Sequence, residues 1–198
     1  MLGVMQGESL SPFLFAIYLN DMESHLQRHD TRGVTIGDLR IMLLLYADDA
    51  VVMSETPAGL QLALDNLRDY ADTWKLTINT EKTKVMVFRK AGRLPVNLRF
   101  LYDNHELSIV NNFTYLGVVF TYTGRFAATQ KTISDQARKS MFAMQKYIRN
   151  FVIIKPSMCL DIFDKLVKPV LMYCSEVWGF HAAATLNHSS FVKNSSTH

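Results

Sequence analysis

Two adjacent aspartates, Asp48 and Asp49, lie inside a largely apolar stretch that runs from position 41 to position 53. The apolar runs on either side are typical of strands buried on both faces, so we expect a hairpin with the acids at its tip. Two like charges about 5 Å apart repel each other by roughly 3 kcal/mol at an effective dielectric constant near ~20, before either desolvation cost is counted. A divalent cation would remove that cost, which makes the pair a candidate metal ligand.

A solvated hairpin turn is the alternative interpretation of the pair, because Asp is common in turns. Tight hairpin turns usually contain Gly or Asn, however. Here Tyr46 and Ala47 precede the acids, and apolar residues resume directly after them. This arrangement favours a functional role for the two carboxylates.

The composition is that of a globular chain, with 48% hydrophobic and 20% charged residues among 198. A chain of this size can bury one sizeable core and a small second lobe. No apolar segment reaches the roughly 20 residues of a membrane helix, and no signal-peptide pattern follows Met1. Cys159 and Cys174 lack the spacing of a disulfide framework or a zinc site. We therefore expect an intracellular protein that binds neither zinc nor a membrane.

The periodicity of apolar residues indicates alternating helices and strands without internal repeats. Ser11 is a candidate helix cap and Pro12 suits a first helical position. We expect helices from 11 to between 28 and 31, from 56–57 through 74, over 127–152 and over 157–173, and we expect Pro169 to end or kink the last one. Strands are expected around 34–36, over 84–88 and over 113–120. One or two hairpins between 95 and 110 should turn at Asp103-Asn104. This order predicts an α+β fold, a sheet with helices on one face.

The C-terminal third is basic, because positions 121 to 170 contain nine Lys and Arg but only three Asp and no Glu. In the helix predicted over 127–152, apolar side chains occupy one face, namely Ile133, Ala137, Met141, Met144 and Ile148. Five bases cluster near the opposite face: Lys131, Arg138, Lys139, Lys146 and Arg149. A face that contacts nucleic-acid phosphates and an ordinary solvated charged face are both compatible with this pattern, and the excess of bases over acids favours the first.

Two paired carboxylates on a hairpin also suit phosphoryl transfer on nucleotides, where two cations about 3.5 to 4 Å apart hold the attacking and leaving oxygens. Such a site normally has a further carboxylate from a neighbouring strand. Asp21 in the first predicted helix and Asp38 in a predicted turn are interpreted as ordinary surface acids. The residues alone therefore leave the metal site incomplete.

Four sequence blocks follow one another in a fixed order. They are GVMQG with LSP at 3–12, YADD at 46–49, LTIN with KT at 76–83, and YLG at 115–117. In order and spacing they resemble successive blocks of the reverse transcriptase palm, and the alanine of YADD with QG and LSP resembles the non-LTR (LINE-type) retrotransposon branch. The resemblance covers about residues 3 to 118, and 168–179 resembles the region that follows the palm in those elements.

The resemblance implies roles for the acidic block and for one lysine. Asp48 would bind the catalytic metal, Asp49 would complete the acidic block, and Tyr46 and Ala47 would lie beside the nucleotide and the primer end. Lys82 would neutralise or protonate the pyrophosphate leaving group.

The resemblance also implies contacts to template and primer. Gln6 and Gly7 would lie against the incoming nucleotide and the template, where glycine permits close backbone approach. Lys84 is the alternative to Lys82. Tyr115, Leu116 and Gly117 would form a hairpin that grips the primer, and the basic helix would act as a thumb against the duplex.

These roles predict a polymerase palm-like antiparallel sheet with helices on one face over 1–120, a thumb-like helical region over 121–180 and a disordered tail over 181–198. The partners would be Mg²⁺ (or Mn²⁺), an RNA template, a DNA primer and deoxynucleoside triphosphates. The family's first metal-binding aspartate and its fingers lie upstream of the Gln-Gly block, so the resemblance implies an N-terminally truncated polymerase that is inactive by itself and that needs the missing N-terminal part.

Three other interpretations are compatible with the sequence. A non-catalytic nucleic-acid-binding remnant of a retroelement would use the basic helix and carry a vestigial acidic block. A decayed fragment would have no function, and a group II intron or other bacterial-type retroelement polymerase is the nearest alternative enzyme. A LINE-type polymerase would be nuclear at the time of action.

Overall fold

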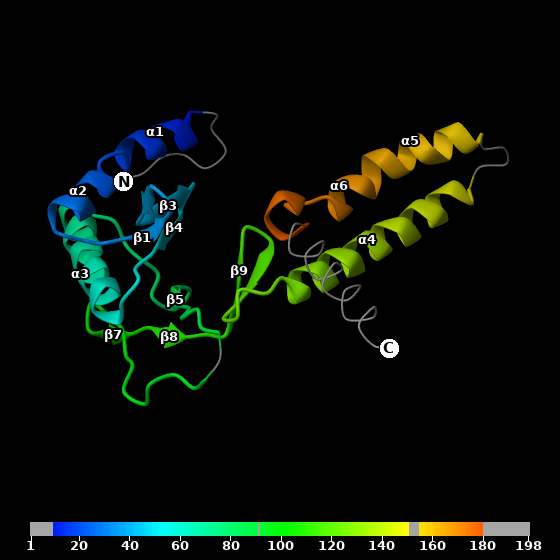
Figure 1. The fold of residues 1–198 in the computed structure, drawn as a ribbon. Helices are drawn as coiled ribbons and strands as arrows, with labels where there is room; N and C mark the ends of the chain where they lie inside the picture. The colour runs from blue at the N-terminus through cyan, green and yellow to red at the C-terminus, as the bar shows by residue number, and fades with distance from the viewer. Residues whose placement is uncertain (1–9, 91, 151–154, 180–198) are drawn as a thin grey trace, which may run out of the picture. The chain divides into compact units, whose positions relative to one another are not determined.

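The computed structural model describes residues 10–90, 92–150 and 155–179 (Figure 1). Gln6, Gly7 and the predicted tail at 181–198 lie outside the described residues. The chain divides into two compact units: the first contains 1–85 and 93–109, and the second contains 86–92 and 110–198. No helix of the described residues is long and apolar enough to cross a membrane.

The first unit combines three helices with short strands that pair two by two. Its elements are α1 (Ser11–Tyr18), α2 (Met22–Arg28), β1 (Val34–Ile36), β2 (Leu39–Ile41), β3 (Leu43–Tyr46), β4 (Asp49–Val52), α3 (Pro57–Trp74), β5 (Lys84–Val85), β6 (Leu101–Tyr102), β7 (His105–Glu106) and β8 (Ser108–Ile109). β1–β2, β3–β4 and β6–β7 are antiparallel hairpins, whereas β5 and β8 pair in parallel. The hairpin predicted to turn at Asp103-Asn104 is the β6–β7 hairpin.

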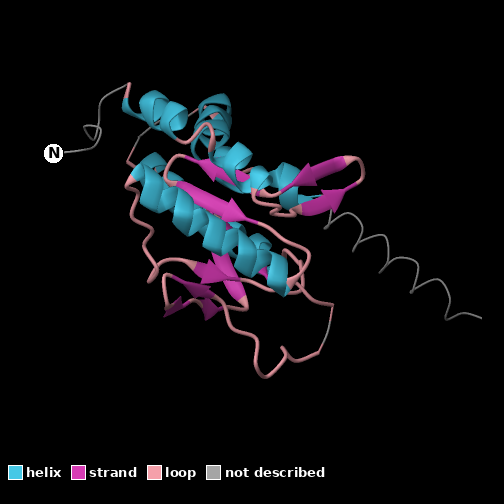
Figure 2. Cartoon of the chain, turned by 90° about the vertical axis from the view of Figure 1, so that its left-hand side faces the viewer, coloured by secondary structure: helices cyan, strands magenta, loops and turns pink. Residues whose placement is uncertain are grey.

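Helix α3 is the centre of the first unit, and it begins where the sequence predicts. The Thr56 side chain accepts a hydrogen bond from the Gly59 N–H (3.0 Å), Pro57 is the first helical residue, and Lys75 ends the helix in the left-handed region. Its buried residues are Ala63, Leu64, Asn66, Leu67, Tyr70 and Ala71. The helix packs against α2, β4 and β6, and Figure 2 shows it crossing the strands of this unit.

Polar side chains of α3 hold the N-terminal helices in place. The buried Asn66 amide donates to the His29 carbonyl oxygen (3.1 Å) and to Thr31 Oγ1 (2.9 Å). The Tyr70 hydroxyl donates to Asp21 Oδ1 at 2.6 Å. Asp21 is exposed, as expected, but it also has this structural role. Burial, together with the bond to Asp21, raises the pKa of Tyr70.

The first predicted helix is interrupted, so the expectation of one continuous helix was wrong. α1 ends at Tyr18 and α2 begins at Met22. The residue that precedes α1 is Leu10, and the predicted cap, Ser11, is the first residue within the helix. Leu19, Asn20 and Asp21 separate the two helices, and Asn and Asp favour turns over helix interiors because their side chains compete for backbone hydrogen bonds.

The predicted single antiparallel sheet was also wrong, because the strands that the structure describes form five separate pairs. The flanks of the Asp pair are not buried on both faces: Leu44 is 44% exposed and Leu45 is 41% exposed. A two-stranded ribbon has no neighbouring strand to extend the sheet and bury such side chains. The strand predicted over 84–88 ends at Val85, where the chain passes into the second unit. The α+β class itself holds.

The second unit places a hairpin on a long helix. It contains β9 (Asn112–Tyr115), β10 (Val118–Thr121), α4 (Ala127–Ile148), α5 (Pro156–Leu166) and α6 (Lys168–Leu171). The single strand predicted over 113–120 is therefore a hairpin. The fully buried Thr129 of α4 accepts from the Val119 N–H (3.1 Å) and donates to the Val119 carbonyl (2.6 Å), which joins α4 to β10.

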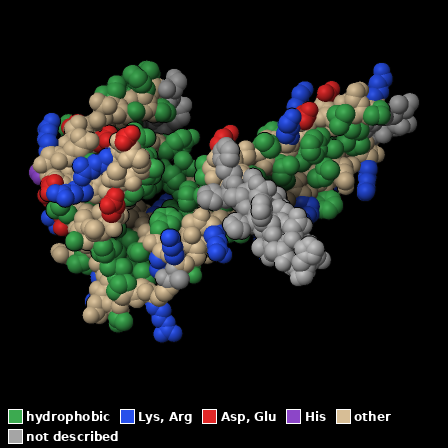
Figure 3. All heavy atoms as spheres, viewed as in Figure 1, with side chains coloured by type: hydrophobic (Ala, Val, Ile, Leu, Met, Phe, Trp, Pro, Cys, Tyr) green, Lys and Arg blue, Asp and Glu red, His purple; other side chains and the backbone are tan. Residues whose placement is uncertain are grey.

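The helices of the second unit pack through a narrow apolar layer. α4 contacts both α5 and α6, and the buried side chains are Ile133, Ala137, Met144 and Val167. The predicted break before Pro169 is confirmed, since α5 ends at Leu166 and α6 starts at Lys168. Figure 3 shows hydrophobic side chains gathered along α4 and α5, with Lys and Arg side chains at the margins.

Candidate nucleotidyl-transfer site

The acidic pair lies at the tip of the β3–β4 hairpin, as predicted. Tyr46 pairs with Asp49, and Ala47 and Asp48 form the two-residue turn. Ala47 has a φ of +51°, a conformation that Gly or Asn adopts more readily. The absence of Gly and Asn at this position therefore does not prevent a tight turn. It makes the turn strained.

Both carboxylates face solvent, which changes the energetic argument for them. Asp48 and Asp49 are exposed, Tyr46 is 62% exposed, and no ion pair within the described ranges includes either acid. Water screens the repulsion to about 1 kcal/mol at 4 Å separation. The pair therefore needs no cation for the fold to form, and the predicted desolvation cost does not arise.

The donor set at this tip fits a hard divalent cation only in part. Exposed carboxylate oxygens are the ligands that Mg²⁺ prefers, and a short hairpin holds the two acids at adjacent positions. Within the part of the chain that the structure describes, however, no group of three or more His, Cys, Asp and Glu side chains could hold a metal ion. Asp48 and Asp49 would supply two ligands, and the described residues place no third one with them.

Lys82 lies in the turn that leads into β5. Its backbone N–H donates to Asn79 Oδ1 (3.0 Å), and the Thr83 N–H and hydroxyl both donate to the Asn79 carbonyl, at 3.0 and 2.8 Å. The LTIN block thus ends in an Asn that organises this turn. The Lys82 side chain is exposed, whereas Lys84 Nζ donates to Ser108 Oγ at 3.5 Å. No ion pair among the described residues joins either lysine to the acidic pair.

The YLG block forms the tip of the β9–β10 hairpin. Tyr115 pairs with Val118, and Leu116 and Gly117 turn the chain with φ values of +47° and +76°. Two consecutive positive φ values are typical of the tightest hairpin turn, which explains the glycine. The Tyr173 hydroxyl donates to the Leu116 carbonyl (2.8 Å), and a Cβ at Gly117 would lie 3.1 Å from Tyr173 Cε1.

The sequence patterns predict no role for Tyr173. It supports the YLG turn from a position 57 residues downstream of Leu116. The only signal for it was that positions 168–179 resemble the region after the palm, and no local pattern pointed to this contact.

The basic side of α4 has the predicted arrangement. All five bases are exposed: Lys131, Arg138, Lys139, Lys146 and Arg149. Arg138 forms an ion pair with Asp135 (3.1 Å), so part of its charge is offset. On the opposite face Ile133, Ala137 and Met144 are buried, whereas Met141 is 36% exposed.

Known proteins provide a comparison for this arrangement. Residues 1–120 match the family described as reverse transcriptase (RNA-dependent DNA polymerase). The chain is 26% identical over 193 residues to an RNA-directed DNA polymerase from the mobile element jockey of Drosophila melanogaster, a match that covers 93% of this chain and 20% of that protein.

Two Pol polyproteins of retrotransposable elements are also similar. The type-1 R2 polyprotein of Popillia japonica is 26% identical over 176 residues, which cover 86% of this chain and 24% of that protein. The R2 polyprotein of Bradysia coprophila is 33% identical over 131 residues, which cover 62% of this chain and 15% of that protein. The chain thus spans about a quarter or less of the length of these relatives.

Proposed function

Because this chain belongs to the reverse transcriptase family, in its non-LTR retrotransposon branch, we propose that it is the palm (1–120) and thumb (121–180) part of an RNA-directed DNA polymerase. The substrates would be an RNA template, a DNA primer and deoxynucleoside triphosphates. The observation that carries the proposal is the YADD hairpin, which presents two exposed carboxylates at one tip.

In this proposal Asp48 and Asp49 would hold Mg²⁺ or Mn²⁺, and the bound cation would supply charge stabilisation for the triphosphate. The exposed Tyr46 ring packs beside the primer end. Lys82 gives a proton from its ammonium group to the pyrophosphate, a role that suits an exposed and mobile side chain. The YLG hairpin and the bases of α4 contact the primer strand and the duplex backbone.

The isolated chain should not polymerise, because a two-metal site normally has a third carboxylate and the described residues bring none to Asp48 and Asp49. The measurement is primer extension on an RNA template with an annealed DNA primer, Mg²⁺ and deoxynucleotides. We expect no extension product above background. Synthesis by the purified chain that disappears in Asp48→Ala would contradict this prediction.

Metal binding by the acidic hairpin can be tested without polymerase activity. Addition of Mn²⁺ should broaden the NMR amide resonances of residues 47–50, and Asp48→Ala with Asp49→Ala should abolish this effect. Asp103→Ala is the matched control, because Asp103 is also an exposed aspartate at a tight hairpin turn. Two results would count against the proposal. One is equal broadening of the amide resonances at the Asp48 and Asp103 hairpins, and the other is unchanged broadening at 47–50 when Asp48 and Asp49 are both replaced by Ala.

A second candidate function, nucleic-acid binding without catalysis, is favoured by the exposed bases of α4. It predicts RNA or DNA binding that weakens steeply with salt but does not respond to Mg²⁺ or to Asp48→Ala. A Mg²⁺-dependent increase in affinity that requires Asp48 would instead favour the polymerase.

A further inference from the structure

A small hollow in the second unit combines an exposed aromatic ring with basic side chains. It has a volume of about 310 Å³ and is lined by Phe88, Arg89, Lys90, Tyr122, Thr123 and Gly124. We call these six residues the Phe88 shelf. None of them is among the predicted site residues.

The Phe88 ring is the apolar part of the shelf, and it is 60% exposed. Residues 86–88 follow the end of β5 and do not belong to a strand. An exposed phenylalanine offers a flat face on which a nucleobase can stack. Exposure of one ring alone is common on protein surfaces, so the inference depends on what surrounds it.

Arg89 provides a fixed positive charge beside that ring. Its guanidinium lies 4.1 Å from the centre of the Tyr122 ring, and its nitrogen atoms donate to Asn111 Oδ1 (3.0 Å) and to the carbonyls of Val87 and Gly92 (both 3.2 Å). All of these partners are uncharged. The position of the guanidinium is therefore set, while no ion pair within the described part of the chain neutralises its charge.

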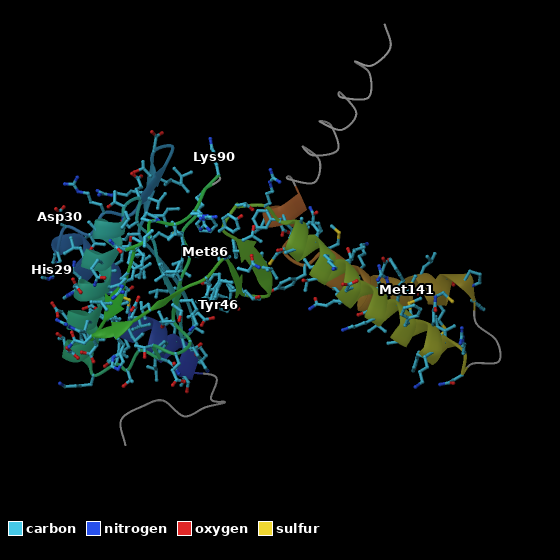
Figure 4. The ribbon with its side chains drawn as sticks, turned by 90° about the horizontal axis from the view of Figure 1, so that it is seen from below. His29, Asp30, Tyr46, Met86, Lys90 and Met141 are labelled. Atoms are coloured by element: carbon cyan, nitrogen blue, oxygen red, sulfur yellow. The ribbon has the colours of Figure 1, made fainter. Side chains whose placement is uncertain are left out.

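The surrounding chain adds cations and no acids. Segments 86–92 and 110–134, which contain the shelf, have no Asp or Glu, but they include Arg89, Lys90, Arg125 and Lys131. Lys90 and Arg125 are exposed, and Figure 4 shows Lys90 directed away from the ribbon. Such a surface attracts a polyanion.

We propose that the Phe88 shelf binds single-stranded nucleic acid, with one base stacked on Phe88 and the adjoining phosphates on Lys90 and Arg125. A polyanion that also carries aromatic bases matches both properties of the shelf. In a duplex the bases are stacked on one another and do not reach a surface ring. This binding does not require the Asp48-Asp49 pair, so it can hold or fail independently of polymerase function.

The test is fluorescence anisotropy with a short labelled oligo(dT) and an abasic oligonucleotide of equal length, using the full chain. Phe88→Ala should weaken oligo(dT) binding about tenfold and leave binding of the abasic strand unchanged. Phe88→Trp should retain the affinity. The matched control is Phe13→Ala, because Phe13 is 64% exposed but lies on α1 of the first unit and outside the basic face of α4.

The phosphate contact has its own variant. Lys90→Ala should weaken binding of both oligonucleotides and reduce the slope of log affinity against log salt by about 0.7. Lys165→Ala removes an exposed lysine of α5. It should change the affinity and the salt slope only by the small effect of the lost net charge.

Three results would overturn the inference. They are oligo(dT) binding that is unaffected by Phe88→Ala, an equal loss in Phe13→Ala, and abasic binding as tight as that of oligo(dT). Binding of the chain to anionic phospholipid vesicles that is lost in Phe88→Ala, without loss of oligo(dT) binding, would assign the shelf to a membrane surface instead. Circular dichroism of each variant checks the fold, which substitutions at exposed positions should preserve.

Discussion

At the scale of single residues, the acidic hairpin depends on an alanine in an unfavourable conformation. Ala47 adopts φ +51°, which costs a residue with a Cβ about 1–2 kcal/mol relative to the right-handed region. The turn places Asp48 beside the exposed Tyr46 and Asp49. Strain at a tip that carries candidate ligands is common at functional sites, where the surrounding structure maintains it.

Ala47→Gly should therefore stabilise the chain. Relief of the left-handed strain exceeds the added entropy of glycine in the unfolded state, and we expect a net gain of about 0.5–1 kcal/mol in the free energy of unfolding. Urea denaturation measures it through the midpoint. Ala50→Gly is the control, because Ala50 lies within β4 opposite Leu45, and there glycine should destabilise. A lower midpoint for Ala47→Gly would disprove the strain.

Tyr70 is the second residue whose environment has a measurable consequence. Tyr70→Phe keeps the ring in the core but removes the hydrogen bond to Asp21, and we expect a loss of about 1–3 kcal/mol. The pKa of Tyr70 is raised in the folded state, so above pH ~10 the unfolded chain loses this proton first. The stability that Tyr70 contributes should then decrease with rising pH, and stability curves for the wild type and Tyr70→Phe should converge at alkaline pH.

At the scale of elements, some features are specified by neighbouring residues and others by contacts between elements. α3 is specified locally by the Thr56 cap, Pro57 and an apolar face, and the structure agrees with the sequence there. The YLG turn is also local, since Gly117 meets its need for a positive φ. The attachment of α4 to the β9–β10 hairpin instead includes a contact between elements, in which the buried Thr129 hydroxyl bonds to the Val119 backbone.

Thr129→Val should loosen this attachment. Valine has nearly the same shape but leaves the Val119 N–H and carbonyl without the hydroxyl, so we expect a loss of about 2–3 kcal/mol and faster hydrogen exchange at the Val119 amide. Thr132→Val is the matched control, because the Thr132 hydroxyl donates only to Ala128 of the same helix. Equal losses in the two variants would show that Thr129 has no special role.

At the scale of the whole molecule, the chain is two units with shallow cores and considerable apolar surface. Exposed apolar side chains occur on the β3–β4 ribbon, for example Leu44 and Leu45, and on the helices of the second unit, for example Phe142 and Leu160.

The chain also spans a quarter or less of the length of the relatives to which it is similar. We propose that the rest of the polymerase supplies the third metal ligand.

The sequence by itself determined the features that depend on neighbouring residues. The family follows from the order of short blocks, the α+β class from apolar periodicity, and the charged side of α4 from helical spacing. The acidic hairpin was predictable for the same reason, because its strands are separated by two residues. A local pattern suffices wherever the partners are close along the chain.

Only the tertiary structure decided which distant residues meet and which faces stay uncovered. Two contacts join parts of the chain that no short sequence pattern relates: the parallel pairing of β5 with β8 and the hydrogen bond from Tyr173 to Leu116. The solvent exposure of Leu44 and Leu45 likewise cannot be predicted from neighbouring residues. An apolar run reads the same whether its strand lies inside a wide sheet or in a two-stranded ribbon. Burial is a property of what surrounds the strand, and for that reason the predicted buried hairpin was found at the surface.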